Sequence, residues 1–154
     1  MKRRALFIGG TGTISTAITA QIAAEGEWDL TLLNRGNRSD EVPDNVTVVK
    51  VDVNDEEAVR KIVDLLRSPW DCVCDFIGFV PAHVERDWRL FKGRTNQYMY
   101  ISSASAYQKP TASPFITEGT PLVNPYWEYS RNKIACEDFL MKKFREEGFP
   151  VTII

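Results

Sequence analysis

Tyr129 and Lys133 have the residue types and the spacing of an acid/base pair. Residues four apart on a helix share one face, so the Lys133 ammonium can lie near the Tyr129 phenol. A nearby positive charge favours the ionised form of a phenol, which brings a tyrosine within range of proton transfer. The alternative is an aromatic residue on a helix surface, so the pair needs support from other motifs.

The stretch "GGTGTIS", residues 9–15, is a second pattern with chemical meaning. A P-loop is excluded, because its last glycine precedes Lys and then Ser or Thr, whereas Gly12 precedes Thr13 and Ile14. The spacing overlaps instead the dinucleotide fingerprint of a Rossmann fold, with Ser15 at its third glycine position. That position serves helix packing, so phosphate binding at the helix N-terminus survives the change. A glycine turn without a ligand is the alternative.

The end of the next apolar run bears on the choice of dinucleotide. The fingerprint has an acidic residue there to hold the ribose 2′-hydroxyl of NAD, and this chain has Asn34 and Arg35. Together with Arg38, these residues suggest a 2′-phosphate held by guanidinium groups. The sequence therefore predicts NADP or NAD as the cofactor and slightly favours NADP. A solvated basic loop is the alternative.

Apolar runs and helix-period segments alternate along the chain and must position these residues. Strands are predicted at 4–8, 29–34, 46–51, 72–78, 97–102 and 150–154. Helices are predicted at 13–26, 55–68, 82–93 and 124–148. In the first helix, Ile14, Ile18 and Ile22 fall on one face. The alternation predicts an α/β fold: a Rossmann-type doubly wound parallel sheet of strand order 3-2-1-4-5-6, with helices on both faces.

Composition limits the partners. With 19 Lys+Arg against 21 Asp+Glu and a net charge of −2, the chain lacks the basic excess that nucleic-acid binding requires. The amino-terminal apolar run is too short for a signal peptide, and no run approaches a membrane span. Its three cysteines, Cys72, Cys74 and Cys136, have no metal-ligand spacing and fit a reducing compartment. We therefore expect a cytoplasmic single domain, residues 1–154, without a metal site.

Three motifs in one order, "GGTGTIS", "SSASAY" and "YSRNK", make the chain resemble a known family. It is similar, over essentially its whole length, to the short-chain dehydrogenase/reductase superfamily, in its extended NAD(P)-dependent epimerase/dehydratase branch. The resemblance implies that Tyr129 acts as the acid/base and that Lys133 also holds the nicotinamide ribose. It implies that Ser103 orients the substrate oxygen, with Ser102 and Ser105 as fallback candidates.

The resemblance also implies contacts to the cofactor. Asp52 matches a family residue that contacts the adenine, although capping the following helix is an alternative role. Where the branch often has an Asn-Ala-rich motif, this chain has "DFIGFVP" after the fourth strand. His83 is the only histidine and is interpreted as part of a first helical turn rather than as a catalytic base. The predicted cofactor contacts are Gly9, Gly10, Thr11, Gly12, Thr13, Ile14, Asn34, Arg35, Arg38, Asp52, Val53, Ile77, Gly78, Tyr129 and Lys133.

The same resemblance narrows the reaction. A dehydratase is disfavoured, because Ala104 and Ser105 stand where dehydratases carry an acidic pair. An epimerase, a ketone reductase or an alcohol dehydrogenase remains open, with hydride transfer at a hydroxyl or carbonyl carbon of a nucleotide sugar or similar small substrate. The alternative is a non-catalytic dinucleotide-binding protein, or an RNA-binding protein like the plastid relatives of this branch.

The family builds much of its substrate pocket from a carboxyl-terminal region. This chain stops inside its predicted sixth strand. We therefore expect the cofactor-binding portion of a longer protein, weakly active or inactive by itself. A homodimer remains open.

Overall fold

The computed structural model describes residues 2–36, 42–66 and 69–154. Within them, six parallel strands form one sheet in the order β3-β2-β1-β4-β5-β6. The strands are β1 (Arg3–Ile8), β2 (Trp28–Asn34), β3 (Thr47–Lys50), β4 (Cys72–Asp75), β5 (Tyr98–Tyr100) and β6 (Val151–Ile153). The helices are α1 (Ser15–Glu25), α2 (Glu56–Leu65), α3 (Pro81–Phe91) and α4 (Glu128–Glu147), with a short 3-10 turn at Ala104–Ala106. The predicted doubly wound α/β fold and its strand order are confirmed.

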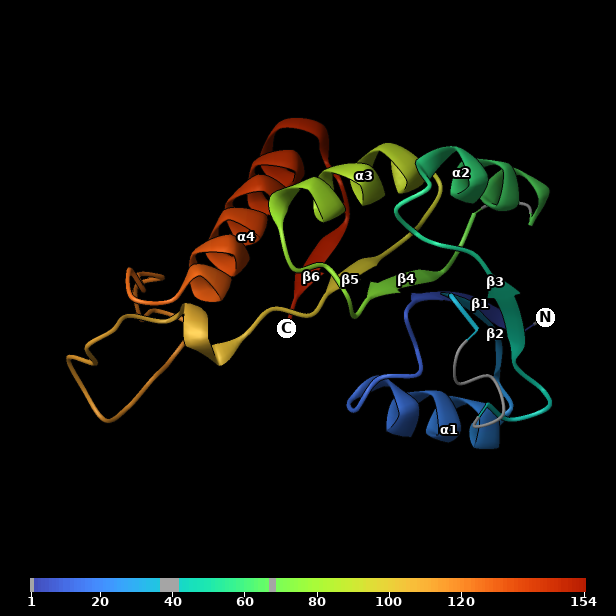
Figure 1. Ribbon diagram of the computed structural model, residues 1–154, viewed down its shortest axis with the longest axis horizontal. Coiled ribbons are helices and arrows are strands. Elements are labelled where there is room, and N and C mark those ends of the chain that lie inside the picture. Colours follow the sequence, from blue (N-terminus) through green and yellow to red (C-terminus); the bar gives the residue numbers. More distant parts are fainter. Residues whose placement is uncertain (1, 37–41, 67–68) are drawn as a thin grey trace.

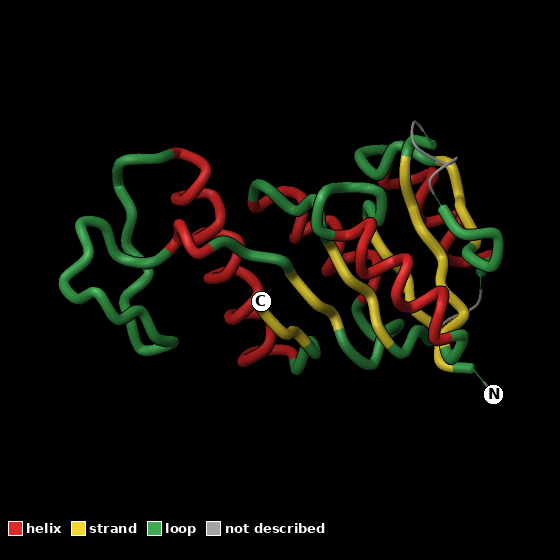
Figure 2. The backbone as a smooth tube through the Cα atoms, turned by 90° about the horizontal axis from the view of Figure 1, so that it is seen from below, coloured by secondary structure: helices red, strands yellow, loops and turns green. Residues whose placement is uncertain are grey.

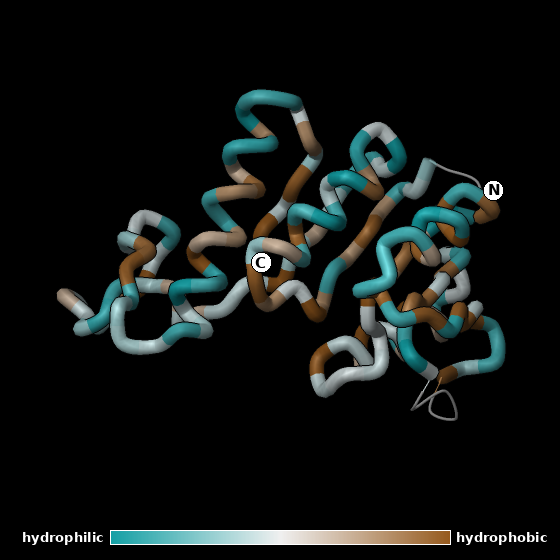
Figure 3. Tube along the Cα trace, turned by 45° about the horizontal axis from the view of Figure 1, so that its top comes forward, coloured by the Kyte–Doolittle hydropathy of each residue, from teal (hydrophilic) through white to brown (hydrophobic). Residues whose placement is uncertain are grey.

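Helical layers cover the two faces of the sheet unequally. Among the described elements, α1 alone covers one face, and α2, α3 and α4 lie in a row over the other (Figure 1). Leu6 and Ile8 of β1 belong to the larger core under that row, whereas Ala5 and Phe7 belong to the core on the α1 side. Hydrophobic and hydrophilic residues alternate along α4 (Figure 3), so one stripe of that helix packs on the sheet.

The first turns of α1 turn polar side chains toward the protein, whereas Ile22 and Ala23 near its end pack on the core. Ile14 is 61% exposed and Ile18 36%, whereas Ser15 and Thr19 are each 2% exposed. The cause is the glycine loop, because the Thr19 hydroxyl donates to the Gly10 carbonyl at 3.0 Å and close approach needs small side chains. The apolar stripe found in the sequence is therefore real, but much of it faces outward.

Two predicted boundaries are wrong because side chains turn the backbone. β4 ends at Asp75 rather than at residue 78, since the Asp75 carboxylate oxygen Oδ1 accepts a hydrogen bond from the Ile77 amide at 2.8 Å. The helix predicted from residue 124 begins at Glu128. Asn124 delays it, because its Oδ1 accepts from the Tyr126 amide at 3.2 Å and its Nδ2 donates to the Ser105 carbonyl at 2.8 Å.

An irregular segment, residues 107–127, extends beyond the amino end of α4, away from the strands (Figure 2). It folds back on itself: the Gln108 amide donates to the Pro121 carbonyl, and the Lys109 amide donates to the Val123 carbonyl, both at 2.8 Å. The segment joins the short turn after β5 to α4, and so it connects the two elements that carry the predicted catalytic residues.

Candidate active site

A cavity of about 720 Å³ opens at the carboxyl ends of β1, β2, β3 and β4. In doubly wound sheets, ligands bind at this edge, where the strand order reverses. The predicted cofactor contacts that line the cavity are Gly9, Gly10, Thr11, Gly12, Thr13, Ile14, Asn34, Arg35, Asp52, Val53 and Ile77. Gly78, Tyr129 and Lys133 are outside this lining, and Arg38 lies outside the described residues.

The glycine loop has the geometry of a close-approach turn. Gly9 and Gly10 have φ angles of +101° and +103°, which side chains disfavour, and a Cβ at Gly10 would lie 2.7 Å from a methyl group of Leu32. A Cβ at Gly12 would meet only the Ser15 hydroxyl, at 3.4 Å. Gly12 therefore keeps space open on the cavity side, as the dinucleotide fingerprint requires.

Ser15 braces this loop from the position of the missing third glycine. Its hydroxyl oxygen accepts a hydrogen bond from the Gly12 amide at 2.9 Å, and the residue is buried. The first helical hydrogen bond runs from the Thr16 amide to the Gly12 carbonyl at 3.0 Å. The serine thus ties the turn to the helix that follows it, which is a packing role.

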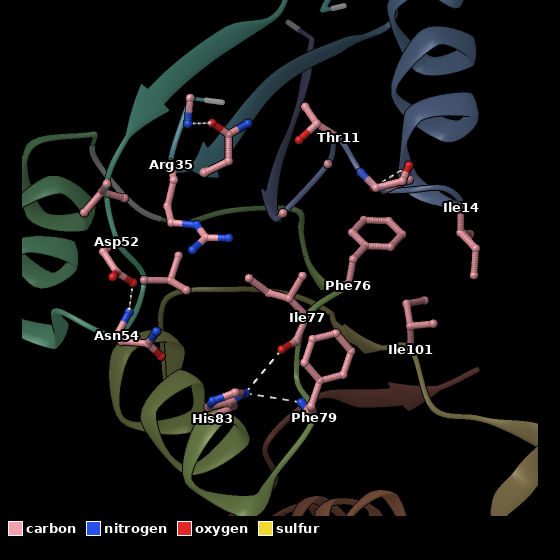
Figure 4. Close-up of a pocket in the computed structure, with 18 of the residues that line it drawn as sticks. Thr11, Ile14, Arg35, Asp52, Asn54, Phe76, Ile77, Phe79, His83 and Ile101 are labelled. Carbon is pink, nitrogen blue, oxygen red and sulfur yellow. Dashed lines mark hydrogen bonds between the residues drawn. The ribbon is translucent and has the colours of Figure 1, made fainter. Parts of the chain in front are cut away.

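The end of β2 presents one unsatisfied donor and one guanidinium. Asn34 accepts a hydrogen bond from the Gly36 amide at 2.8 Å through Oδ1, but its buried Nδ2 has no partner among the described residues. A buried donor without an acceptor is unfavourable. A ligand that offers Nδ2 an acceptor would therefore be stabilised here. The Arg35 guanidinium reaches into the cavity toward Asp52 and Ile77 (Figure 4).

Two acidic residues that follow β3 have different roles. Asp55 is the N-cap of α2, since its carboxylate accepts from the Ala58 amide at 3.0 Å. Asp52 lines the cavity instead, with Oδ1 accepting from the Asn54 amide at 3.0 Å. The alternative interpretation of Asp52 as a helix cap is therefore wrong.

The turn after β4 forms the opposite wall of the cavity. His83 lies in the first turn of α3, as predicted, and its Nδ1 is 3.2 Å from both the Phe79 amide and the Ile77 carbonyl (Figure 4). Nδ1 accepts from the Phe79 amide when it is unprotonated and donates to the Ile77 carbonyl when it is protonated, so in either tautomer the imidazole bonds to this turn. Phe76, Ile77 and Phe79 project from this turn into the cavity.

Three serine hydroxyls form a chain beside the cavity. The Ser103 and Ser105 oxygens are 2.9 Å apart, and the Ser130 hydroxyl donates to Ser105 at 2.9 Å. Ser102 is engaged elsewhere, by a short hydrogen bond to Glu137. Burial raises the pKa of Glu137. Of the predicted serines, Ser103 and Ser105 thus belong to this chain of hydroxyls, and Ser102 does not.

Lys133 and Tyr129 share a face of α4, but the ammonium bonds to the backbone. Lys133 is 2% exposed, and its Nζ donates to the carbonyls of Gly78 and Ile101, each at 2.7 Å. Burial lowers the pKa of this ammonium. Nζ lies 5.7 Å from the centre of the Tyr129 ring, which also contacts Phe79 at 6.4 Å between ring centres.

Phe79 and Ile101 lie between the cavity and the predicted catalytic residues. Phe79 lines the cavity and touches the Tyr129 ring. Ile101 lines it too, and its carbonyl holds Lys133. The predicted catalytic residues therefore stand directly behind one wall of the cavity. We call Ser103, Ser105, Tyr129, Ser130 and Lys133 the hydroxyl cluster.

The sequence placed Phe76 beside the groove and Ser15 in the loop, but several other residues that line the cavity were not predicted: Gly36, Val51, Asn54, Phe79, His83, Arg86 and Ile101. One of them, Arg86, carried a usable signal. It stands with Asp87 between Val84 and Leu90, which face the core, so the charged pair falls where helical periodicity expects burial. A charged pair on the buried face of a helix indicates an internal ion pair.

The residues that the structure describes give little support to a membrane span, a metal site or a reactive thiol. Among them, no helix is long and apolar enough to cross a membrane. In the same residues, no group of three or more His, Cys, Asp and Glu is arranged to hold a metal ion. The three cysteines are buried, and burial raises the pKa of the Cys72 thiol to about 11, which is unfavourable for a reactive thiolate.

The sheet order and the glycine-loop cavity define the chain as a Rossmann-type α/β protein with a site at its strand ends. Its sequence matches the model of one family over residues 5–154, and the chain belongs to that family, the NAD dependent epimerase/dehydratase family. The comparison with curated proteins returned no match.

Solved structures share the fold at low sequence identity. A dTDP-glucose 4,6-dehydratase from Bacillus anthracis in complex with NAD has a TM-score of 0.83 at 16% identity, over 98% of this chain and 53% of that one. A UDP-glucose 4-epimerase from Brucella ovis in complex with NAD has a TM-score of 0.80 at 19% identity, over 98% and 50%. An epimerase from Methanothermobacter thermautotrophicus gives 0.83 at 14% identity, over 99% and 50%. The chain thus spans about half the length of these proteins.

Proposed function

We propose that the chain is the NAD(P)-binding portion of an epimerase or oxidoreductase whose acid/base is Tyr129. The observation that carries this proposal is that the cavity and the predicted catalytic residues lie next to each other. Phe79 and Ile101 are shared between the glycine-loop cavity and the wall that holds Tyr129 and Lys133. Cofactor and catalytic residues must meet in this way for hydride transfer next to a proton donor.

Two features of the cavity fit a dinucleotide. Gly12 leaves open space at the N-terminus of α1, where a pyrophosphate is stabilised by backbone amides and by the helix dipole. The Asn34 Nδ2 group is a buried donor in need of an acceptor, which a ribose or phosphate oxygen can supply. Asp52 and Val53 would hold the adenine end, and Ile77 would lie along the groove.

Arg35 supports NADP over NAD. A guanidinium in the cavity, with Asn34 in place of an acidic residue, suits a 2′-phosphate better than a free 2′-hydroxyl. Relatives of known structure were solved with NAD, as the proteins from Bacillus anthracis and Brucella ovis were. The preference for NADP is thus a property that we propose for this chain.

The bound nicotinamide would supply hydride acceptance and donation. Tyr129 would exchange the proton with the substrate oxygen, and Lys133 beneath it would favour the ionised phenol and contact the nicotinamide ribose. Ser103 would hold the same substrate oxygen, with Ser105 and Ser130 fixing its hydroxyl direction. We propose a nucleotide sugar or a similar small molecule as the substrate, in line with the substrates named for the similar structures.

Calorimetric titration of NADPH and NADH into the chain and its Gly12→Val form tests the cofactor assignment. A side chain at residue 12 fills the space that close approach needs, so we expect Gly12→Val to weaken both nucleotides by about a hundredfold or more. Gly119→Val is the matched control, because Gly119 lies in the irregular segment with only Thr117 near its Cβ position, at 3.7 Å. Equal affinity of the Gly12→Val and unmodified forms would overturn the assignment.

A further inference from the structure

A buried charged cluster, of which Arg86 lines the cavity, has no part in the proposed reaction. Asp75 ends β4, and Asp87 and Arg86 lie on α3 against it. Both carboxyl groups belong to residues that are 0% exposed, and Arg86 is 5% exposed. Buried ionisable groups are unfavourable unless each charge and each polar atom is satisfied, so the protonation of this cluster is constrained by its partners.

Asp87 has hydrogen-bond donors on both carboxylate oxygens. Its Oδ1 accepts from the Arg86 Nε at 2.8 Å and lies 2.7 Å from the Arg86 Nη2. Its Oδ2 accepts from the Tyr98 hydroxyl at 2.8 Å. The Arg86 guanidinium and the donors on both oxygens favour the ionised form, so Asp87 is assigned as the carboxylate of the pair.

Asp75 has the opposite environment. Its Oδ1 accepts from the Ile77 amide at 2.8 Å, but its buried Oδ2 has no donor among the described residues. Among the described residues, Asp87 is the side chain whose charge and hydrogen bonding raise the pKa of Asp75. Two carboxylates cannot hydrogen-bond to each other without a proton. A proton on Asp75 Oδ2, donated to Asp87, satisfies every oxygen of the pair.

The charges around Asp75 also favour a proton on its carboxyl group. Burial raises the pKa of Asp75 well above its ordinary value, and the neighbouring Asp87 raises it further, whereas the Ile77 amide and then Arg86 oppose these effects more weakly. Lys133 faces the same carboxyl group from α4. The other titratable groups that interact with Asp75 are Cys74 of β4, Tyr98 and Tyr100 of β5, and Cys136 of α4.

The protonated carboxyl supports the turn that separates the cavity from Lys133. A Cβ at Gly78 would lie too close to Asp75 Oδ2 for any side chain, so the Gly78 backbone rests directly on the carboxyl group. The Gly78 carbonyl in turn accepts from Lys133 Nζ at 2.7 Å and from the Tyr100 hydroxyl at 3.0 Å. Asp75 thus acts on the site through the backbone of residues 76–79.

We propose that Asp75 is a positioning residue, protonated at neutral pH, that fixes the turn 76–79 by donating to Asp87 and accepting from the Ile77 amide. The turn then holds Phe79 and Ile77 in the cavity wall and the Gly78 carbonyl over Lys133. The consequence for cofactor affinity rests on the proposed function, whereas the protonation of Asp75 does not.

The infrared spectrum of the chain near pH 7 tests the protonation directly. We expect a carbonyl-stretch band of a protonated carboxylic acid that disappears in Asp75→Asn. The band must persist in Glu137→Gln, since burial raises the pKa of Glu137 as well, and in Asp64→Asn, whose side chain lies in an exposed ion pair. A spectrum of Asp75→Asn unchanged from that of the unmodified chain would overturn the proposal.

Thermal unfolding at several pH values gives a second readout. In the unfolded chain Asp75 ionises near its ordinary pKa of about 3.9, whereas the folded chain keeps the proton to higher pH. The contribution of Asp75 to the free energy of unfolding is therefore complete below about pH 4. It is lost as the pH rises toward the pKa of Asp75 in the folded chain. Asn keeps the geometry without titrating, so the unfolding temperature of Asp75→Asn should rise relative to that of the unmodified chain as the pH is raised above about 4. A constant difference would contradict the proposal.

NADPH affinity then separates positioning from mere stability. The Asn amide can donate to Asp87 while its oxygen accepts from Ile77, so Asp75→Asn should bind NADPH within about twofold of the unmodified chain. Asp75→Ala removes both bonds and should weaken binding by about tenfold in the chain that remains folded. Equal weakening by Asn and Ala would refute the role of the carboxyl proton. Loss of NADPH binding by the unmodified chain would instead strike the proposed function, while the infrared result stands by itself.

Discussion

The cavity and the hydroxyl cluster are built in different ways, although they share a wall. The glycine loop and the ends of β2 and β3 present backbone amides and side chains directly from the sheet, so short stretches of sequence determine them. The hydroxyl cluster is assembled from a short turn, the amino end of α4 and the irregular segment between them, joined by side-chain bonds such as that from Asn124 to Ser105. The half to which we assign the cofactor is therefore built from local sequence, whereas the half to which we assign catalysis depends on long-range contacts.

The largest expected effect lies in the catalytic half. In the enzyme that we propose, Tyr129→Phe should lower turnover of a nucleotide sugar by about 10²–10⁴-fold, because proton transfer loses its donor. NADPH affinity should stay within about twofold, since the phenol lies outside the cavity lining. Steady-state kinetics with UDP-glucose and dTDP-glucose provide the measurement. Undiminished turnover would remove Tyr129 from the mechanism and with it the division of labour between the two regions.

A smaller effect is expected within the cavity. Arg35→Ala removes a guanidinium that would form charge-assisted hydrogen bonds to a 2′-phosphate, so NADPH should bind about 10- to 100-fold more weakly. NADH should change by less than about threefold, because it lacks that phosphate. Arg60→Ala, in an exposed ion pair on α2, is the control. Equal loss of both nucleotides, or of neither, would reject the phosphate role of Arg35.

The smallest effect concerns the loop brace. Ser15→Ala leaves the Gly12 amide without its acceptor and should lower the free energy of unfolding by about 1 kcal/mol. Thr16→Ala is a matched control, because the Thr16 hydroxyl donates to the Gly12 carbonyl at 2.8 Å from an exposed position, where water can replace it. Urea unfolding of both variants measures the difference. A loss for Thr16→Ala as large as that for Ser15→Ala would show that Ser15 does not brace the loop.

The same division explains how far the sequence leads. Alternating strands and helices predicted the fold and strand order, because right-handed crossovers between parallel strands leave few possible topologies. Eleven of the predicted cofactor contacts line the cavity, since the glycine loop and the strand ends are adjacent in the sequence to the strands that position them. The NADP preference and the catalytic roles stay predictions.

What the sequence could not predict depends on side chains that meet across the fold. Asp75 ends β4 by bonding to Ile77, and no apolar pattern records that bond. The exposure of Ile14 follows from the contact of Thr19 with the glycine loop. His83 and Phe79 enter the cavity wall only because α3 returns over the end of β4, so their roles needed the structure.

A crystal structure of the chain grown with NADPH tests the central claim most directly. We expect the pyrophosphate at the glycine loop and the N-terminus of α1, the 2′-phosphate at Arg35, and the nicotinamide between Phe79 and Ile101, facing Ser103 and Tyr129. A nucleotide bound away from the glycine loop, or a nicotinamide turned away from the hydroxyl cluster, would contradict the account.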